Sequence, residues 1–313
     1  MTAVLRIGTR RSALATTQSG HVADLIRERL GREVELVEIT TEGDANGAPL
    51  ATMGGTGVFV GAVRDALLRG EVDIAVHSLK DLPTQPAEGV ALAAVPTRED
   101  PRDAVVARDG LTLGELPNGS RVGTGSPRRA AQLEALGLGL AIEEIRGNVD
   151  TRISKVASGQ YDAVVLALAG LVRLGRSDEA TEVMDPLQML PAPGQGALAI
   201  ECRSDDTDLH DELAALEDPA SRAAVSAERA VLATLEAGCS APVGALAEVV
   251  EGEDGDELWI RAVALSPDGG LSIRMSMTGA VDDAVGTGNR LASEMLADGA
   301  ADLMHAPVRK QQA

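Results

Sequence analysis

The chain has 313 residues, enough for two or three domains with their own cores, and a formal net charge of −20. This acidity, with single Phe, Trp and Tyr residues, argues against nucleic-acid binding and against anionic membrane surfaces. Two cysteines make no disulfide framework, and the sequence shows neither a secretory leader nor an apolar stretch of membrane-spanning length. We therefore expect a cytoplasmic protein without nucleic-acid or membrane partners.

The first hundred residues alternate strands and helices, as in βαβ units. Ser12 is the expected N-cap of the first helix. The turn-rich segment 40–57, which includes Gly54 and Gly55, is either a mobile loop or a plain surface connection. The expected strands cover 4–8, 34–39, 73–78 and 90–95, and the expected helices cover 13–30 and 58–68.

Lys80 and Asp81 directly follow the apolar strand that ends at Ser78. Ligands of open α/β sheets bind at the carboxyl ends of strands, so these two charges are candidates for a site. The alternative is a solvated ion pair in a turn.

A Pro-bracketed charged linker, residues 96–103, marks the first predicted domain boundary. Beyond it the same pattern returns, and Pro127 is suited to the first turn of a helix. The expected strands cover 103–107, 120–124, a segment ending at 145, and 161–167; helices are expected over 127–136 and from 146–152 onward, and residues 169–173 follow the last strand.

Residues 121–176 contain eight basic and five acidic side chains, a local charge of +3 in an acidic protein. Five arginines lie just after expected strands or at helix starts, where free backbone N–H groups and the helix dipole also favour anions. They are Arg128, Arg129, Arg146, Arg152 and Arg173. This placement predicts an anion-binding cradle rather than scattered surface charges.

A second Pro/Gly linker, 190–196, precedes a strand at 197–202, in which Cys202 is expected to be inert. Cys239 differs because it lies in a Gly/Pro loop after a helix, where its sulfur can be presented to a ligand. The remaining expected elements are helices over 208–216, 221–235 and 288–304, and strands over 243–250, 258–265 and 271–277.

Six motifs, in this order and spacing, resemble the porphobilinogen deaminase (hydroxymethylbilane synthase) family over nearly the whole chain. They are Arg-Ile-Gly-Thr-Arg-Arg-Ser at 6–12, Ala-Val-His-Ser-Leu-Lys-Asp-Leu-Pro at 75–83, Gly-Thr-Gly-Ser-Pro-Arg-Arg at 123–129, Arg-Gly-Asn-Val-Asp-Thr-Arg at 146–152, Pro-Gly-Gln-Gly-Ala at 193–197 and Leu-Glu-Ala-Gly-Cys at 235–239.

The resemblance implies an α/β fold of two periplasmic-binding-protein-like lobes plus a small C-terminal α+β domain with a three-stranded antiparallel sheet. The implied domains are 1–98 with 197–217, 99–196, and 218–313. The family joins four porphobilinogen molecules head to tail into hydroxymethylbilane, releasing ammonia, on a covalent dipyrromethane primer. The resemblance further implies a monomer of tetrapyrrole (haem) biosynthesis that takes porphobilinogen as its substrate.

The resemblance also assigns roles to individual residues. Asp81 corresponds to the catalytic aspartate, and Cys239 to the attachment point of the dipyrromethane. Implied substrate or cofactor contacts are Arg10, Ser12, Lys80, Thr124, Ser126, Arg128, Arg129, Arg146, Asn148, Arg152, Arg173 and Gln195. Gly54, Gly55 and Phe59 belong to the family's loop, and no metal site is implied. Thr52 and Thr56 stand where relatives often carry lysines.

Two other functions fit this pattern less well. A non-catalytic two-lobed binding protein for an organic anion would leave Asp81 and Cys239 without a role. A ligand-sensing regulator would need a DNA-binding helix pair and a basic face, and neither is visible in the sequence.

Overall fold

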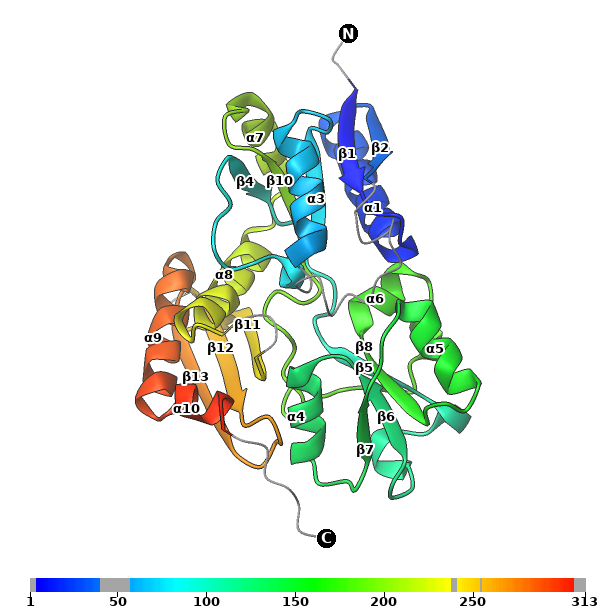
Figure 1. Ribbon diagram of the computed structural model, residues 1–313. Helices are drawn as coiled ribbons and strands as arrows, with labels where there is room; N and C mark the ends of the chain where they lie inside the picture. Colours follow the sequence, from blue (N-terminus) through cyan, green and yellow to red (C-terminus); the bar gives the residue numbers. More distant parts are fainter. Residues whose placement is uncertain (1–3, 40–56, 238–240, 254, 307–313) are drawn as a thin grey trace. The chain divides into compact units, whose positions relative to one another are not determined.

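The computed structural model describes residues 4–39, 57–237, 241–253 and 255–306 (Figure 1). The chain divides into two compact units. Unit 1 comprises Met1–Glu99 and Ala197–Arg222, and unit 2 comprises Asp100–Gly196 and Ala223–Ala313. The boundary at 222/223 falls inside one continuous helix, α8 (Pro219–Thr234).

Unit 1 holds a five-stranded sheet of order β2-β1-β3-β10-β4, in which β10 runs antiparallel to both its neighbours. Its strands are β1 (Leu5–Thr9), β2 (Val34–Glu38), β3 (Ile74–Ser78), β4 (Val90–Ala94) and β10 (Leu198–Arg203). Its helices are α1 (Ala13–Leu30), α3 (Gly57–Leu68) and α7 (Thr207–Leu213), with short 3-10 turns η2 (Leu79–Asp81) and η6 (Ala214–Leu216).

The expected helix α1 is confirmed, including its cap. The Ser12 hydroxyl accepts a hydrogen bond from the Ala15 backbone N–H at 3.3 Å, and Gly31 ends the helix in the left-handed region. One sheet face packs on α1 and α7 through residues such as Ile26 and Leu213. The other packs on α3, where Ala66 and Leu67 meet Ala75 of β3.

The first part of unit 2 repeats this design with a five-stranded sheet of order β7-β6-β8-β5-β9. Its strands are β5 (Asp103–Ala107), β6 (Arg121–Thr124), β7 (Ala141–Glu144), β8 (Ala163–Ala167) and β9 (Glu182–Val183). Its helices are α4 (Pro127–Ala135), α5 (Val149–Ala157) and α6 (Leu168–Arg173), with 3-10 turns η3 (Arg108–Gly110), η4 (Leu113–Glu115) and η5 (Ser177–Glu179).

The two sheets correspond strand for strand. In the spatial order of each sheet, three parallel strands are followed by an antiparallel strand, β10 in unit 1 and β5 in unit 2. Strand β10 comes directly after the chain returns to unit 1, and β5 directly after it first passes into unit 2. The expected α/β fold class, with two mixed sheets that are each covered by helices, is confirmed. The two-residue strand β9 was not expected, because so short a segment carries no periodicity.

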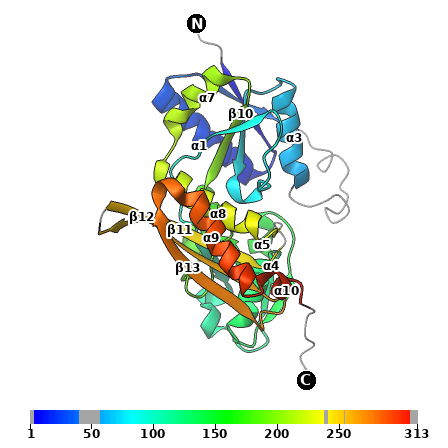
Figure 2. The ribbon, with the colours of Figure 1, turned by 90° about the vertical axis from the view of Figure 1, so that its left-hand side faces the viewer.

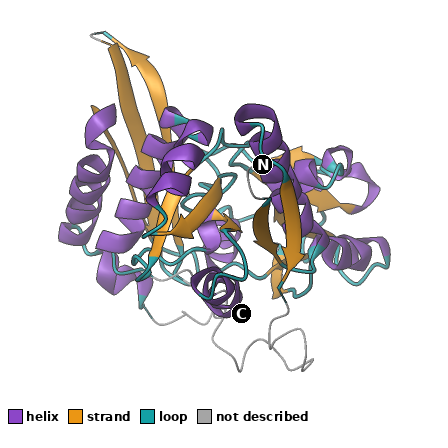
Figure 3. Cartoon of the chain, turned by 90° about the horizontal axis from the view of Figure 1, so that it is seen from above, coloured by secondary structure: helices purple, strands orange, loops and turns teal. Residues whose placement is uncertain are grey.

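The last part of unit 2 is the expected three-stranded antiparallel sheet, of order β11-β12-β13. Its strands are β11 (Val243–Gly252), β12 (Gly255–Leu265) and β13 (Ser272–Ala280); η7 (Val281–Asp283), α9 (Ala284–Ala297) and α10 (Ala300–Met304) follow. Helix α9 lies across the sheet in Figure 2, and the β11–β12 hairpin extends beyond these helices in Figure 3. The expectation of a single final helix is wrong, because Gly299, at φ 94°, separates α9 from α10.

Within unit 2, helix α4 packs against the opposite face of this sheet. Ala131 and Leu190 form one apolar cluster with Leu246, Val263 and Leu265. The hairpin glycine Gly269 also lies against the α4 backbone, and a Cβ there would be 2.3 Å from the Ala131 carbonyl oxygen. The arginine-bearing helix and the C-terminal sheet are therefore packed together.

Candidate active site

In unit 1 the structure places Lys80 and Asp81 as expected, directly after β3. Strand β3 ends at Ser78, and the single 3-10 turn η2 carries both charged residues. Leu79, which is fully buried, anchors the turn, and its backbone N–H donates to the Ala197 carbonyl at 3.0 Å. The buried leucine between half-buried neighbours fixes the turn that carries the two charged residues.

A cavity of about 70 Å³ lies beside this turn, wholly within unit 1. It is lined by Arg10, Ala15, Gln18, Val60, Val76, His77, Ser78 and Asp81. Within the described residues, no hydrogen bond or ion pair engages the half-buried Asp81 carboxylate. A volume this small holds one polar group rather than a pyrrole with two acid side chains. Unit 1 thus offers an available carboxylate and a guanidinium around a small hollow.

Ser12, another predicted site residue, already has a structural role. Its hydroxyl oxygen caps α1, directly after Arg10 and Arg11, so its role in the fold is accounted for. The hydroxyl hydrogen is still able to donate to an anion. Gly54 and Gly55 lie outside the described residues, and of Phe59 only its place in α3 is described.

In unit 2, the start of α4 has the expected helix-opening geometry. Ser126 is the N-cap, its hydroxyl accepts from the Arg129 backbone N–H at 3.5 Å, and Pro127 occupies the first turn. The buried Thr124 hydroxyl accepts from the Ser126 backbone N–H at 3.2 Å. This turn presents a helix N-terminus at the carboxyl end of β6, which favours an anion.

The structure places Arg128 and Arg129 in a buried ion-pair network that the sequence did not predict. Asp103, fully buried at the start of β5, accepts from Arg128 Nη1 at 2.8 Å and from Arg129 Nη2 at 2.7 Å. Burial by itself raises the pKa of Asp103, but the two guanidinium groups outweigh it and hold that pKa well below its usual range. Both guanidinium groups are therefore engaged by a protein carboxylate, and their predicted contacts with a substrate or cofactor stay a prediction.

Gln195 completes the same network. Its side chain is fully buried, and its Nε2 donates to Asp103 Oδ1 at 2.8 Å and to the Pro101 carbonyl at 2.7 Å. Arg173 is half-buried and donates to the Gly196 carbonyl at 2.6 Å. Both side chains hold the linker 190–196 in place, and Gln195 is engaged by the protein rather than exposed for a substrate.

The remaining cradle residues lie at the start of α5. Asn148 is its N-cap, with Oδ1 accepting from the Thr151 backbone N–H at 2.8 Å. Arg146 is exposed and pairs with Glu144 at 2.6 Å. Arg152 is half-buried, donates to the Gly147 carbonyl at 2.8 Å, and has its pKa lowered by burial and by the charge of Arg129. Arg152 and Arg129 therefore form the cationic centre of this unit.

Of the two cysteines, the structure describes Cys202, and it is buried as expected. Cys202 is fully buried in β10, and burial raises the pKa of its thiol to about 11, so it is unreactive at neutral pH. Cys239 lies outside the described residues.

Sequence patterns missed Asp103, His77 and Glu201. A signal was present for Asp103, because an acid that opens an otherwise apolar strand needs a buried partner. Glu201 gave the same signal within the apolar strand β10.

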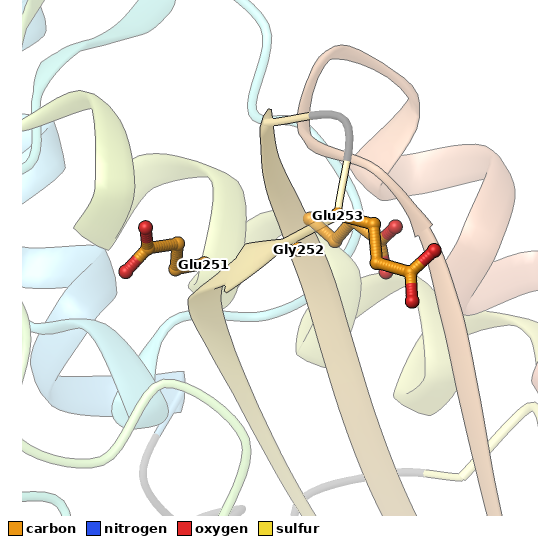
Figure 4. Close-up of a pocket in the computed structure, with 4 residues that line it drawn as sticks. Glu251, Gly252 and Glu253 are labelled. Carbon is orange, nitrogen blue, oxygen red and sulfur yellow. The ribbon is translucent and has the colours of Figure 1, made fainter.

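The tip of the β11–β12 hairpin has a second hollow, lined by Glu251, Gly252, Glu253 and Glu257. Figure 4 shows the carboxylates of Glu251 and Glu253 turned to opposite sides. Over the ranges that the structure describes, no group of three or more His, Cys, Asp or Glu side chains is arranged to hold a metal ion. In those same ranges, no helix has the length and apolar character needed to span a membrane.

The fold is that of an α/β protein with charged side chains and a helix N-terminus at the carboxyl ends of its strands, an arrangement suited to an organic anion. Residues 5–211 match the family model described as "Porphobilinogen deaminase, dipyromethane cofactor binding domain", and residues 222–297 match "Porphobilinogen deaminase, C-terminal domain". The chain belongs to the porphobilinogen deaminase family. It is thus a transferase of tetrapyrrole biosynthesis, with a domain for a dipyrromethane cofactor.

Individual relatives are similar along their whole length. The chain is 61% identical to "Porphobilinogen deaminase 1" of Streptomyces avermitilis, over 96% of this chain and 97% of that protein. It is 58% identical to "Porphobilinogen deaminase" of Mycobacterium tuberculosis, over 96% and 98% respectively. Among solved structures, a periplasmic substrate-binding protein from Coxiella burnetii matches 69% of this chain and 93% of its own, at 15% identity and a TM-score of 0.45.

Proposed function

We propose that this chain condenses four porphobilinogen molecules head to tail into hydroxymethylbilane on a dipyrromethane primer attached to Cys239. Each addition forms one carbon–carbon bond, and the aminomethyl nitrogen of the incoming molecule leaves as ammonia. The observation that carries the proposal is the available Asp81 carboxylate in a cavity shared with Arg10.

Asp81 is the group suited to the cationic step. When ammonia leaves porphobilinogen, the remaining pyrrole carries a positive charge that a nearby carboxylate stabilises. Asp81 is half-buried, and within the described residues no partner diverts its charge. Lys80, on the same turn, and Arg10, across the cavity, are suited to the acid side chains of the substrate.

The donor set fits a dipyrromethane with its acetate and propionate groups. Arg128 and Arg129 share one carboxylate, Asp103, which leaves an excess positive charge inside unit 2. Arg128 Nε is buried and has no hydrogen-bond partner in the described structure, so the site has an unused donor. When bound, the dipyrromethane supplies the primer to which new rings are added. The side chains that would hold its carboxylates are Arg128, Arg146, Arg152, Thr124 and Ser126.

We further propose that residues 1–98 with 197–217 form the lobe that carries Asp81, and that residues 99–196 form the arginine lobe. Residues 218–313 then form the domain that carries Cys239. The packing of α4 on β11–β13 supports this arrangement, because it joins the arginine helix to the domain that holds the attachment cysteine.

The attachment is tested by intact-mass measurement of the folded protein. The parent chain and a matched Cys202→Ala variant should both show the added mass of a dipyrromethane, and Cys239→Ser should lack it. Equal masses for all three proteins would sink the attachment claim.

Asp81→Asn tests the catalytic step separately. We expect this variant to keep the primer mass and to lose turnover by about 100-fold or more, since a positioned charged group contributes about 10²–10⁴-fold. A variant that retains most of its turnover would remove Asp81 from the catalytic role. A binding-only protein would take up porphobilinogen without ammonia release and without added mass.

The oligomeric state and compartment complete the proposal. We propose a cytoplasmic monomer, in keeping with the strongly acidic composition. Sedimentation velocity of the purified chain should give a single species of the 32.2 kDa chain, and cell fractionation should recover the protein in the cytoplasmic fraction; a dimer or a membrane-bound pool would contradict it.

A further inference from the structure

Two buried side chains and one half-buried side chain, from three elements of unit 1, meet beside the Asp81 cavity. Glu201 of β10 accepts two hydrogen bonds from Arg64 of α3, from Nε at 2.9 Å and from Nη2 at 2.6 Å. His77 of β3 brings its Nε2 to 3.3 Å from Glu201 Oε2, off the line of a straight hydrogen bond. The side chains of His77, Glu201 and Arg64 are 7%, 4% and 14% exposed.

The strand register accounts for this meeting. In the antiparallel pair of β3 and β10, His77 lies opposite Ala199 and Ala75 lies opposite Glu201. His77 and Glu201 are thus diagonal neighbours on one face of the sheet, the face that α3 covers. The network links α3 to the strand that leads into the Asp81 turn.

The charges of the network are internally balanced. Burial by itself raises the pKa of Glu201, but the hydrogen bonds and charge of Arg64, together with the nearby His77, lower it to about 2. Glu201 is therefore ionised at neutral pH, and Arg64 neutralises it. A carboxylate 3.3 Å from Nε2 favours the ring tautomer that carries its proton there.

Stability alone gives a weak reason for this arrangement. A buried ion pair is often no more stabilising than well-packed apolar residues of the same volume. Here the pair lies beside His77, a residue that lines the cavity together with Asp81 and Arg10. Within the described residues, no group bonds to the second ring nitrogen, Nδ1. A ring held on one side and available on the other is suited to orienting a ligand.

We propose that His77 is a positioning residue of this site: held by Glu201 and Arg64, its Nδ1 accepts a hydrogen bond from the polar group in the cavity and keeps that group against Asp81. This inference rests on the proposed function, since the group so held belongs to the porphobilinogen that reacts. Arg64 and Glu201 act only through His77.

The test compares His77→Leu, Glu201→Gln and the double variant with the parent holoenzyme, by primer mass and by kcat and KM for porphobilinogen. We expect each single variant to carry the primer and to lose about tenfold in kcat, the equivalent of one hydrogen bond, with KM within about twofold. The double variant should be no slower than His77→Leu, because Glu201 acts through the ring. Glu212→Gln, which breaks the Arg32–Glu212 pair elsewhere in unit 1, is the matched control and should match the parent.

If the Glu201→Gln variant does not fold because it lacks the buried charge, His77→Asn provides a second test. The asparagine amide lies near the position of Nδ1, so this variant should recover part of the kcat that His77→Leu loses, whereas a merely structural role predicts no such recovery. Parent-like kcat in His77→Leu, or multiplied losses in the double variant, would overturn the inference alone. A parent chain without primer and without turnover would overturn the proposed function as well.

Discussion

Replacing Asp103 by asparagine tests the buried network that orients the two adjacent arginines. Asp103 is fully buried and accepts four hydrogen bonds: one from Arg128 Nη1 at 2.8 Å, two from Arg129 at 3.1 and 2.7 Å, and one from Gln195 at 2.8 Å. Asparagine has nearly the same volume, so the change opens no cavity. It removes the negative charge and puts an amide donor where acceptors are needed.

The expected cost follows from the burial of all three charges. Removing one partner of a buried ion pair typically destabilises a protein by about 3–5 kcal/mol, because the remaining charge is left desolvated. Here two guanidinium groups, 4% and 7% exposed, lose their common carboxylate. We expect the free energy of unfolding of unit 2 to fall by about 3–5 kcal/mol, a large share of the roughly 5–15 kcal/mol typical of a domain.

Urea unfolding followed by tryptophan fluorescence measures this change directly. The chain has one tryptophan, Trp259, and it lies on β12 in unit 2. Asp109→Asn is the matched control, because Asp109 pairs with Arg108 in the same unit while its side chain is 70% exposed. An exposed pair contributes about 0–1 kcal/mol. An Asp103→Asn effect no larger than that of the control would refute the reasoning.

Two further predictions concern proton uptake and backbone packing. The pKa of Glu201 in the folded protein, about 2, lies below its ordinary value of 4.5. The ionised carboxylate therefore stabilises the fold fully above about pH 5, and this contribution, about 3 kcal/mol, is lost as the pH falls from 4.5 toward 2. Glu201→Gln should remove that part of the pH dependence of the free energy of unfolding in urea titrations. Gly269 and Gly175 share a φ of 67°, but a Cβ at Gly269 meets the Ala131 carbonyl at 2.3 Å whereas one at Gly175 meets open space. Gly175→Ala should cost about 1–2 kcal/mol of backbone strain and Gly269→Ala about 1–3 kcal/mol more, by Trp259 fluorescence; equal costs would contradict the close packing of α4.

The sequence predicted features correctly where the stabilising interaction joins residues that are close together in the chain. Ser12 caps α1 because a hydroxyl just before an amphipathic run satisfies a free backbone N–H, and Pro127 starts α4 because that position needs no donor. The failure at Gly299 is also local, since an apolar pattern continues on both sides of the glycine and hid the break between α9 and α10.

Ion pairs and hydrogen bonds between residues far apart in the chain could not be predicted from the sequence. The charge count that predicted an anion-binding cradle covered residues 121–176, whereas the carboxylate that binds Arg128 and Arg129 is at 103. Likewise Gln195 and Asp103 are 92 residues apart, and Arg64 and Glu201 are 137 apart. No period or motif within a segment reports which distant charge will lie beside it.

The sequence alone therefore determined the order and type of most elements, the family resemblance, and the position of Lys80 and Asp81 at the end of a strand. These follow from residue periodicity, caps and motif spacing, all of which act over a few residues. The tertiary structure decided which charges are available, because availability depends on what packs against a side chain. In the structure, Asp81 lines a cavity, and Arg128 and Arg129 form ion pairs with Asp103. His77 lines the same cavity and lies beside Glu201.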